Sequence, residues 1–237
     1  MLLAGILLMA KPALADSYYP YEIQGYDVTV KVGKDNVYHV TERLQVNFNQ
    51  ARHGIYRDIP VINNVSREDG STSRIQARVT NIKTYGEKRT VGREGSYCRI
   101  QLGDKNKTLV GEHMYHISYD YNMGKDVRKG EDEFYYNIIG TSWDTTIQNV
   151  TFHIMMPEDI DESKVGMAYG ESGSTNNEGL QYTINGKVME GYVDSSIILN
   201  PGEAVTVRMV LPDGYYDQVK QRIWPALISI LLSLAAA

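Results

Sequence analysis

Cysteine is nearly absent from this chain, since Cys98 is the single cysteine in 237 residues. One cysteine cannot form an internal disulfide, and a cysteine-based zinc site is excluded as well. The folded state must therefore be stabilised by its core. Cys98 lies in a segment that is typical of a strand, so we expect a buried and inert thiol. A catalytic or cross-linking thiol is the alternative.

Excess positive charge is also missing. The formal net charge is −5, and the 24 Lys and Arg residues are spread along the chain. A nucleic-acid-binding domain normally shows a basic patch or stripe. No nucleic acid is therefore expected among the partners.

The familiar catalytic motifs are absent too. The sequence contains no G-x-S-x-G and no H-E-x-x-H. His113 and His116 are three residues apart, which places them on opposite faces of a strand. The acidic runs 131–133 and 158–162 are interpreted as solvated loops, with calcium binding as the alternative. We therefore predict no catalytic residue, no metal ligand and no cofactor.

Tyrosine, in contrast, is abundant, with 18 Tyr against 3 Phe and 2 Trp. Tyrosine suits half-buried strand positions, where the ring packs and the hydroxyl stays wet. The excess therefore favours a β-rich fold. The alternative is an exposed aromatic surface for sugars or peptides, for which the candidates are Tyr18, Tyr19, Tyr21, Tyr135 and Tyr136.

Apolar segments stand at both ends of the sequence. Residues 1–10 form an apolar run, and Ala13-Leu14-Ala15 offers an A-x-A site, so residues 1–15 are predicted to be a cleaved signal peptide. An uncleaved anchor and a buried helix are the alternatives. Residues 223–237 carry no charge, and residues 220–237 are predicted to be the truncated start of a transmembrane helix. An amphipathic helix packed on the domain is the alternative there.

Between these ends, residues 16–217 alternate apolar and polar side chains with a period of two. Such alternation, with turn residues between the runs, is typical of half-buried strands. Asn185-Gly186 is a strong hairpin signal. We predict an all-β, antiparallel sandwich of about eleven strands, with a helical apolar segment at each end. A division near residue 105 into two packed subdomains is the alternative. The polar segments 66–73, 85–96 and 123–133 are interpreted as surface loops.

One charged residue is out of place in this pattern. Glu42 lies in phase with Val40, Leu44 and the other apolar residues of its strand. A buried carboxylate is costly unless it is paired and hydrogen-bonded. Arg57 is the nearest cation in an equally apolar setting, and Arg holds a carboxylate through two parallel hydrogen bonds. We therefore predict a buried structural ion pair between Glu42 and Arg57. A catalytic acid and an exposed Glu42 at a strand edge are the alternatives.

Three groups of segments resemble a family of bacterial predicted membrane proteins, catalogued as domain of unknown function 2207. His53–Pro60 is the most specific part, and the segments are 40–48 with 53–60, 115–121 with 132–143 and 147–157, and 199–207 with 211–216. The resemblance implies an exported β-rich domain followed by membrane helices. No reaction, ligand or catalytic residue is established for the family, so none is carried over.

Together these observations predict a non-enzymatic domain anchored in the cell membrane and facing the extracytoplasmic side. Its expected partners are the membrane, through the C-terminal helix, and an unknown envelope ligand or protein. A cell-envelope hydrolase acting on glycan or peptide is one alternative. A structural spacer is the other.

Overall fold

The computed structural model describes residues 19–66, 70, 72–126, 128 and 130–220. Within them the chain is all-β, with fifteen strands where the sequence predicted about eleven, and one short 3₁₀ helix, η1 (Glu162–Lys164). The strands are β1 (Tyr21–Val32), β2 (Val37–Arg52), β3 (Gly54–Pro60), β4 (Ile62–Ser66), β5 (Thr72–Gln76), β6 (Arg78–Thr84), β7 (Arg89–Glu94), β8 (Tyr97–Gly103), β9 (Leu109–Asn122), β10 (Glu131–Ile139), β11 (Val150–Met155), β12 (Val165–Gly170), β13 (Leu180–Asn185), β14 (Val188–Val193) and β15 (Ala204–Pro212).

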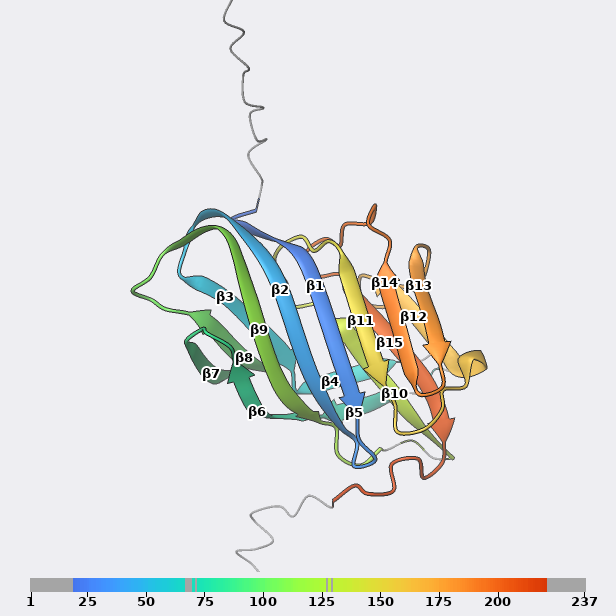
Figure 1. Ribbon diagram of the computed structural model, residues 1–237. Helices are drawn as coiled ribbons and strands as arrows, with labels where there is room; N and C mark the ends of the chain where they lie inside the picture. Colours follow the sequence, from blue (N-terminus) through green and yellow to red (C-terminus); the bar gives the residue numbers. More distant parts are fainter. Residues whose placement is uncertain (1–18, 67–69, 71, 127, 129, 221–237) are drawn as a thin grey trace, which may run out of the picture.

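The strands form two layers (Figure 1). One layer is a seven-stranded sheet of order β13-β14-β11-β1-β2-β9-β6. Three smaller sheets lie behind it: β10-β15-β12, β3-β8-β7 and the β4-β5 pair. The seven-stranded sheet takes strands from both sides of residue 105: β1, β2 and β6 precede it, and β9, β11, β13 and β14 follow it.

Alternation explains why the seven-stranded sheet has one buried face. Along β1 and β2 every second side chain is buried, as with Val28, Val30 and Leu44, while the residues between them face outward. Side chains of successive strand residues point to opposite faces, so this pattern directs one face toward the second layer. The buried core lies between the two layers.

The expected antiparallel arrangement needs one correction. β1 pairs with β11 in parallel, with Tyr26 opposite Val150, and the other strand pairs of the described residues are antiparallel. β10 lies in the other layer, so the chain returns to the seven-stranded sheet by a crossover before β11 begins. Parallel neighbours need such a connection, and residue alternation contains no information about it.

The predicted hairpin between β13 and β14 is present, but its turn is shifted by one residue. Asn185 still belongs to β13 and pairs with Val188, so Gly186 and Lys187 are the central residues. Gly186 has φ +57°. A positive φ at the first central position is the conformation that a type II′ turn requires and that glycine adopts freely.

The segments interpreted as loops are partly strands. β7 lies inside 85–96, β4 and β5 border the segment 66–73, and β10 begins within 123–133. β7 was missed because all of its residues are exposed, so no alternation marks it. The predicted signal peptide (1–15) and, apart from Lys220, the predicted start of a transmembrane helix (220–237) lie outside the described residues. Among the residues that are described, no helix is long and apolar enough to cross a membrane.

Candidate functional site

The polar centre of the molecule is Glu42, in the middle of β2. It pairs in register with Val28 of β1 and Ile117 of β9, so it lies inside the seven-stranded sheet and not at an edge. Its side chain faces the second layer and is 0% exposed, and Arg57 of β3 is 2% exposed. The charge of each residue is therefore removed from water.

Glu42 and Arg57 are in contact across the two layers. Arg57 Nε donates to Glu42 Oε2 over 2.8 Å, and Arg57 Nη2 donates to Oε1 over 2.8 Å. These are two parallel bonds of the kind that a planar guanidinium offers to a carboxylate. Arg57 Nη1 also donates to the carbonyl of Asp58 over 2.8 Å. The ion pair thus links β2 in one layer to β3 in the other.

Two tyrosines complete the environment of the carboxylate. The Tyr26 hydroxyl donates to Glu42 Oε2 over 2.8 Å, and the Tyr119 hydroxyl donates to Oε1 over 2.6 Å. A second-layer tyrosine, Tyr136, lies 3.0 Å from the Tyr119 hydroxyl, oxygen to oxygen. Because Tyr119 uses its hydrogen on Glu42, Tyr136 is the donor in this last bond. We call these five residues the buried charge network.

Sequence reasoning identified the ion pair and missed the tyrosines. Tyr26 lies opposite Leu44 and Tyr119 opposite Val40, which places both two residues from Glu42 on the same face. Such diagonal neighbours are within reach of long side chains. The alternation of each strand already indicates that Tyr26 and Tyr119 point to the buried face. Only the register between the strands shows that they lie next to Glu42.

The network fixes the protonation state of its members. Burial alone would raise the pKa of Glu42, but the charge of Arg57 and the hydrogen bonds from Arg57, Tyr119 and Tyr26 lower that pKa below its ordinary value. Burial raises the pKa of Tyr26 and Tyr119 well above 10.0, so both stay neutral donors. Glu42 is thus an ionised acceptor that holds no proton to donate.

A small cavity adjoins the network. It has a volume of ≈ 30 Å³ and is lined by Arg57, Tyr136, Asn137 and Gly140, among others. A volume of this size holds about one water molecule. The cavity therefore has no room for a substrate beside the ion pair.

The four candidate surface tyrosines that the structure describes do not form an exposed patch. Tyr21 and Tyr136 are buried, Tyr19 and Tyr135 are half-buried, and Tyr18 lies outside the described residues. The Tyr21 hydroxyl donates to Asp144 Oδ1 over 2.6 Å, and Tyr136 belongs to the buried charge network. The expectation of a tyrosine binding surface at these positions was wrong, because the inward strand phase places two of them in the core.

A wider hollow opens at the β2–β3 turn. We call it the rim groove; its volume is ≈ 320 Å³, and its lining residues are Ala51, Arg52, His53, Gly54, Ile55, Tyr56, Gln101 and Leu102. None of these carries a carboxylate, a thiol or a hydroxyl other than the phenol of Tyr56. Sequence reasoning missed the groove, because the turn meets β8 only in the folded chain.

Two glycines explain how the backbone is shaped beside this groove. Gly54 and Gly103 are paired residues of β3 and β8, with φ +136° and +134°. A Cβ on Gly54 would lie 1.9 Å from the carbonyl oxygen of Leu102, and a Cβ on Gly103 would lie 2.0 Å from that of His53. Only glycine allows the two backbones to approach this closely, which accounts for Gly54 in the His53–Pro60 segment.

The other candidate groups lie apart. Cys98 is half-buried, not fully buried as expected, and burial raises the pKa of its thiol. His113 contacts Glu87 at 2.8 Å, whereas His116 stacks on Tyr85. Within the described stretches, no three His, Cys, Asp or Glu side chains are grouped so that they could hold a metal ion.

The fold and the site define a two-layered β-domain with a sealed charge network in its core and an open groove at one end. The chain belongs to the family described as the predicted membrane protein (DUF2207) N-terminal domain, whose model matches residues 22–211. No curated protein matches the sequence.

Solved structures give a weak likeness only. One is an M1 zinc metallopeptidase from Deinococcus radiodurans, 12% identical, with a TM-score of 0.39 and coverage of 79% of this chain and 42% of that one. Another is the leukotriene A4 hydrolase of Saccharomyces cerevisiae, 7% identical, with a TM-score of 0.41 and coverage of 84% and 32%. This chain spans less than half the length of these structures. Likeness at this level carries no inference about activity.

Proposed function

We propose that this chain is a non-enzymatic domain that is anchored in the cell membrane, faces the extracytoplasmic side and binds a ligand or protein partner at the cell envelope. One observation carries the proposal. Glu42, the most deeply buried carboxylate of the described residues, is enclosed and committed to Arg57, Tyr26 and Tyr119. The rim groove, in contrast, is open to solvent and has no carboxylate in its lining. The enclosed carboxylate suits a structural role, and the open groove suits binding of a ligand.

The last described segment of the chain places the rim groove relative to the proposed anchor. β2 runs from Val37 to Arg52, so its first residues and the rim groove lie at opposite ends of the sandwich. The last described segment packs at the first end, where Gln218 N donates to the carbonyl of Lys34 over 3.1 Å. With an anchor at residues 220–237, the rim groove faces away from the membrane.

The proposal has two parts that separate experimentally. For orientation, protease is added to intact protoplasts that carry the full chain with an epitope tag inserted at Gly70. Cleavage of the domain is expected, and full protection would contradict the extracytoplasmic placement.

For binding, the full chain is cross-linked in native membranes and purified with whatever is attached to it. A reproducible envelope component is expected on the wild-type chain. Recovery of the chain alone would contradict a binding role. Release of a glycan or peptide fragment by the purified chain, abolished in a single-residue variant, would contradict the non-enzymatic assignment.

A further inference from the structure

We propose that the rim groove binds an anionic, hydroxyl-rich polymer, one that carries carboxylate or phosphate groups beside sugar or polyol hydroxyls. This inference deepens the proposed function and rests on it, since it names the ligand chemistry of the same domain. The residues that carry it are Arg52, His53, Tyr56 and Gln101, all of which line the groove.

The size and openness of the groove fit one unit of such a polymer. Its volume of ≈ 320 Å³ lies at the lower end of the range of small-ligand sites, roughly 300–1,000 Å³. The groove lies at the end of the sandwich where β2 turns into β3, so a long chain can pass over it. A polymer therefore needs to place only one unit inside.

Arg52 supplies a charge for the anionic group. Its guanidinium carbon lies 5.2 Å from the ring centroid of Tyr21, which supports the half-buried side chain. Among the residues that the structure describes, no Asp or Glu lies within ion-pair distance of Arg52. A supported and unneutralised guanidinium is suited to bind a carboxylate or phosphate through two hydrogen bonds.

His53 and Gln101 supply partners for hydroxyl groups. The ring nitrogen Nδ1 of His53 lies 3.0 Å from the carbonyl oxygen of Lys107. A carbonyl only accepts, so Nδ1 carries the hydrogen, and Nε2 is left for a hydroxyl group of the ligand. The Gln101 amide offers both a donor and an acceptor, which is what a polyol requires.

Tyr56 supplies an apolar face. It is 49% exposed. The guanidinium carbon of Arg99 lies 5.0 Å from the ring centroid, and Asp58 holds Arg99 through two bonds of 2.8 and 2.7 Å. The ring is therefore fixed before any ligand arrives, and a rigid aromatic surface costs little conformational entropy on binding.

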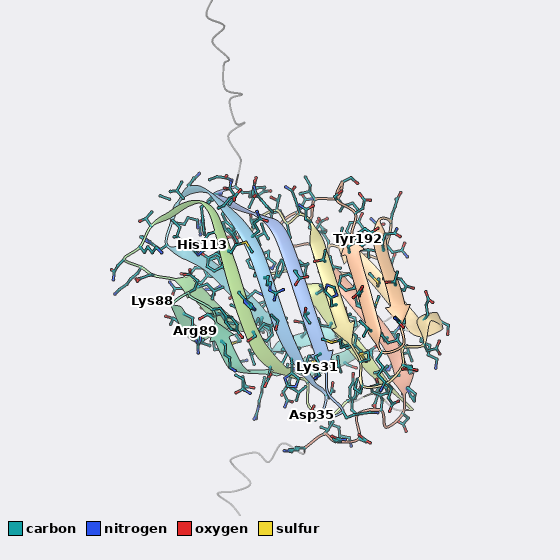
Figure 2. The ribbon with its side chains drawn as sticks, in the orientation of Figure 1. Lys31, Asp35, Lys88, Arg89, His113 and Tyr192 are labelled. Atoms are coloured by element: carbon teal, nitrogen blue, oxygen red, sulfur yellow. The ribbon has the colours of Figure 1, made fainter. Side chains whose placement is uncertain are left out.

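The surroundings of the groove favour an anion although the chain as a whole has a net charge of −5. Arg89 of β7 is exposed, and its backbone pairs with that of Leu102, which lines the groove. Figure 2 shows Lys88 and Arg89 together at the β7 side of the molecule. Lys88 pairs with Asp104 at 2.5 Å, so Arg89 is the charge that adds to that of Arg52. Lys31 and Asp35 lie at the end of the sandwich opposite the β2–β3 turn (Figure 2). Positive charge near a cleft raises the local concentration of an anionic ligand.

The test uses the full chain in detergent and three fluorescently labelled polymers: polygalacturonate, poly(glycerol phosphate) and neutral dextran. Binding is followed by fluorescence anisotropy. We expect binding of at least one anionic polymer and weaker binding of dextran. Preference for polygalacturonate identifies a carboxylate source, and preference for poly(glycerol phosphate) identifies a phosphate source. Equal binding of all three, or of none, would overturn the inference.

Variants then locate the site. Arg52→Gln is expected to weaken binding of the anionic polymer by about tenfold, the size of one lost charge-assisted contact. Lys31→Gln removes the same charge from the exposed outer face at the opposite end, so it is the matched control and should leave the affinity unchanged. Equal losses in the two variants would mean that only net charge matters and would refute the site.

Two further readouts keep the test decisive. If Arg52→Gln alters the circular dichroism spectrum, Gln101→Ala replaces it, with the same expected direction and a loss of about threefold to tenfold. If neither groove variant changes polymer binding while membrane cross-linking still captures an envelope component, the rim groove is wrong and the proposed function survives. If cross-linking captures nothing while the groove variants still lose affinity, the rim groove is confirmed as a polymer site and the binding of an envelope partner in the membrane is contradicted.

Discussion

One stretch of chain, from Glu42 to Arg57, contributes to both charged regions of this molecule, and it uses its charges in opposite ways. Glu42 and Arg57 face the interior, meet at 2.8 Å and are closed off by tyrosine hydroxyls. Arg52 and His53, at the turn between the same two strands, line an open groove. The comparison shows two uses of charge in this domain. The enclosed and paired charges of Glu42 and Arg57 stabilise the fold, whereas the charge of Arg52 at the strand ends is available to a ligand.

The largest expected effect comes from breaking the enclosed pair. Glu42→Gln leaves the guanidinium of Arg57 buried without its counter-charge, so we expect a loss of about 3–5 kcal/mol in the free energy of unfolding. Chemical denaturation of the full chain in detergent measures it. Arg43→Met is the control, because Arg43 is the next residue on β2 but is exposed on the outer face. A Glu42→Gln variant as stable as Arg43→Met would contradict a structural role for the pair.

The next largest effect tests the close approach of β3 and β8 beside the rim groove. Gly54→Ala places a Cβ against the Leu102 carbonyl at a positive φ, and we expect a loss of about 3 kcal/mol, at the upper end of the usual backbone strain. Gly92→Ala on β7 meets nothing within 4 Å and should change stability by less than about 0.5 kcal/mol. Thermal unfolding of the two variants side by side makes the comparison, and similar melting temperatures would show that β3 and β8 do not approach so closely.

A smaller effect tests the tyrosines that enclose the carboxylate. Tyr119→Phe removes one donor to Glu42 and leaves the ring in place, so we expect about 1.5–3 kcal/mol of destabilisation. Tyr85→Phe is the matched control, because Tyr85 is exposed at 56%. If both substitutions were neutral, the hydroxyl of Tyr119 would not be part of the network that holds the ion pair.

The smallest expected effect is the pH dependence of the stability that Glu42 contributes. The folded-state pKa of Glu42 lies below its ordinary value of 4.5, so the unfolded chain takes up a proton first as the pH falls. The stabilisation from Glu42 is therefore complete above 4.5 and is lost as the pH drops through the lowered pKa. The stability difference between wild type and Glu42→Gln should narrow only in that acid range. A difference that vanished already at neutral pH would contradict the lowered pKa.

The two regions also differ in how far the sequence predicts them. Alternation along β1 and β2 identifies the buried face and makes Glu42 conspicuous, because a carboxylate in an apolar phase demands a partner. It cannot supply the register that brings Tyr26 and Tyr119 to that carboxylate, nor the parallel pairing of β1 with β11, which depends on a crossover between layers. The rim groove has no local signal, since it forms where the β2–β3 turn meets β8.

Residue alternation also fails to predict strands that expose both faces to water. β7 is exposed along its whole length, so its residues have no apolar phase and were interpreted as a loop. The tyrosine surface failed for the opposite reason. Tyr21 and Tyr136 lie in the inward phase, and abundance in the composition does not say which face a ring takes.

A double-mutant cycle on Glu42 and Arg57 tests the central claim most directly. Unfolding free energies are measured for wild type, Glu42→Gln, Arg57→Met and the double variant, all as full chains in detergent. If the pair is an enclosed structural unit, the double variant is far less destabilised than the sum of the single ones, with a coupling energy of about 2–3 kcal/mol. Additive losses, with coupling under about 0.5 kcal/mol, would contradict the account.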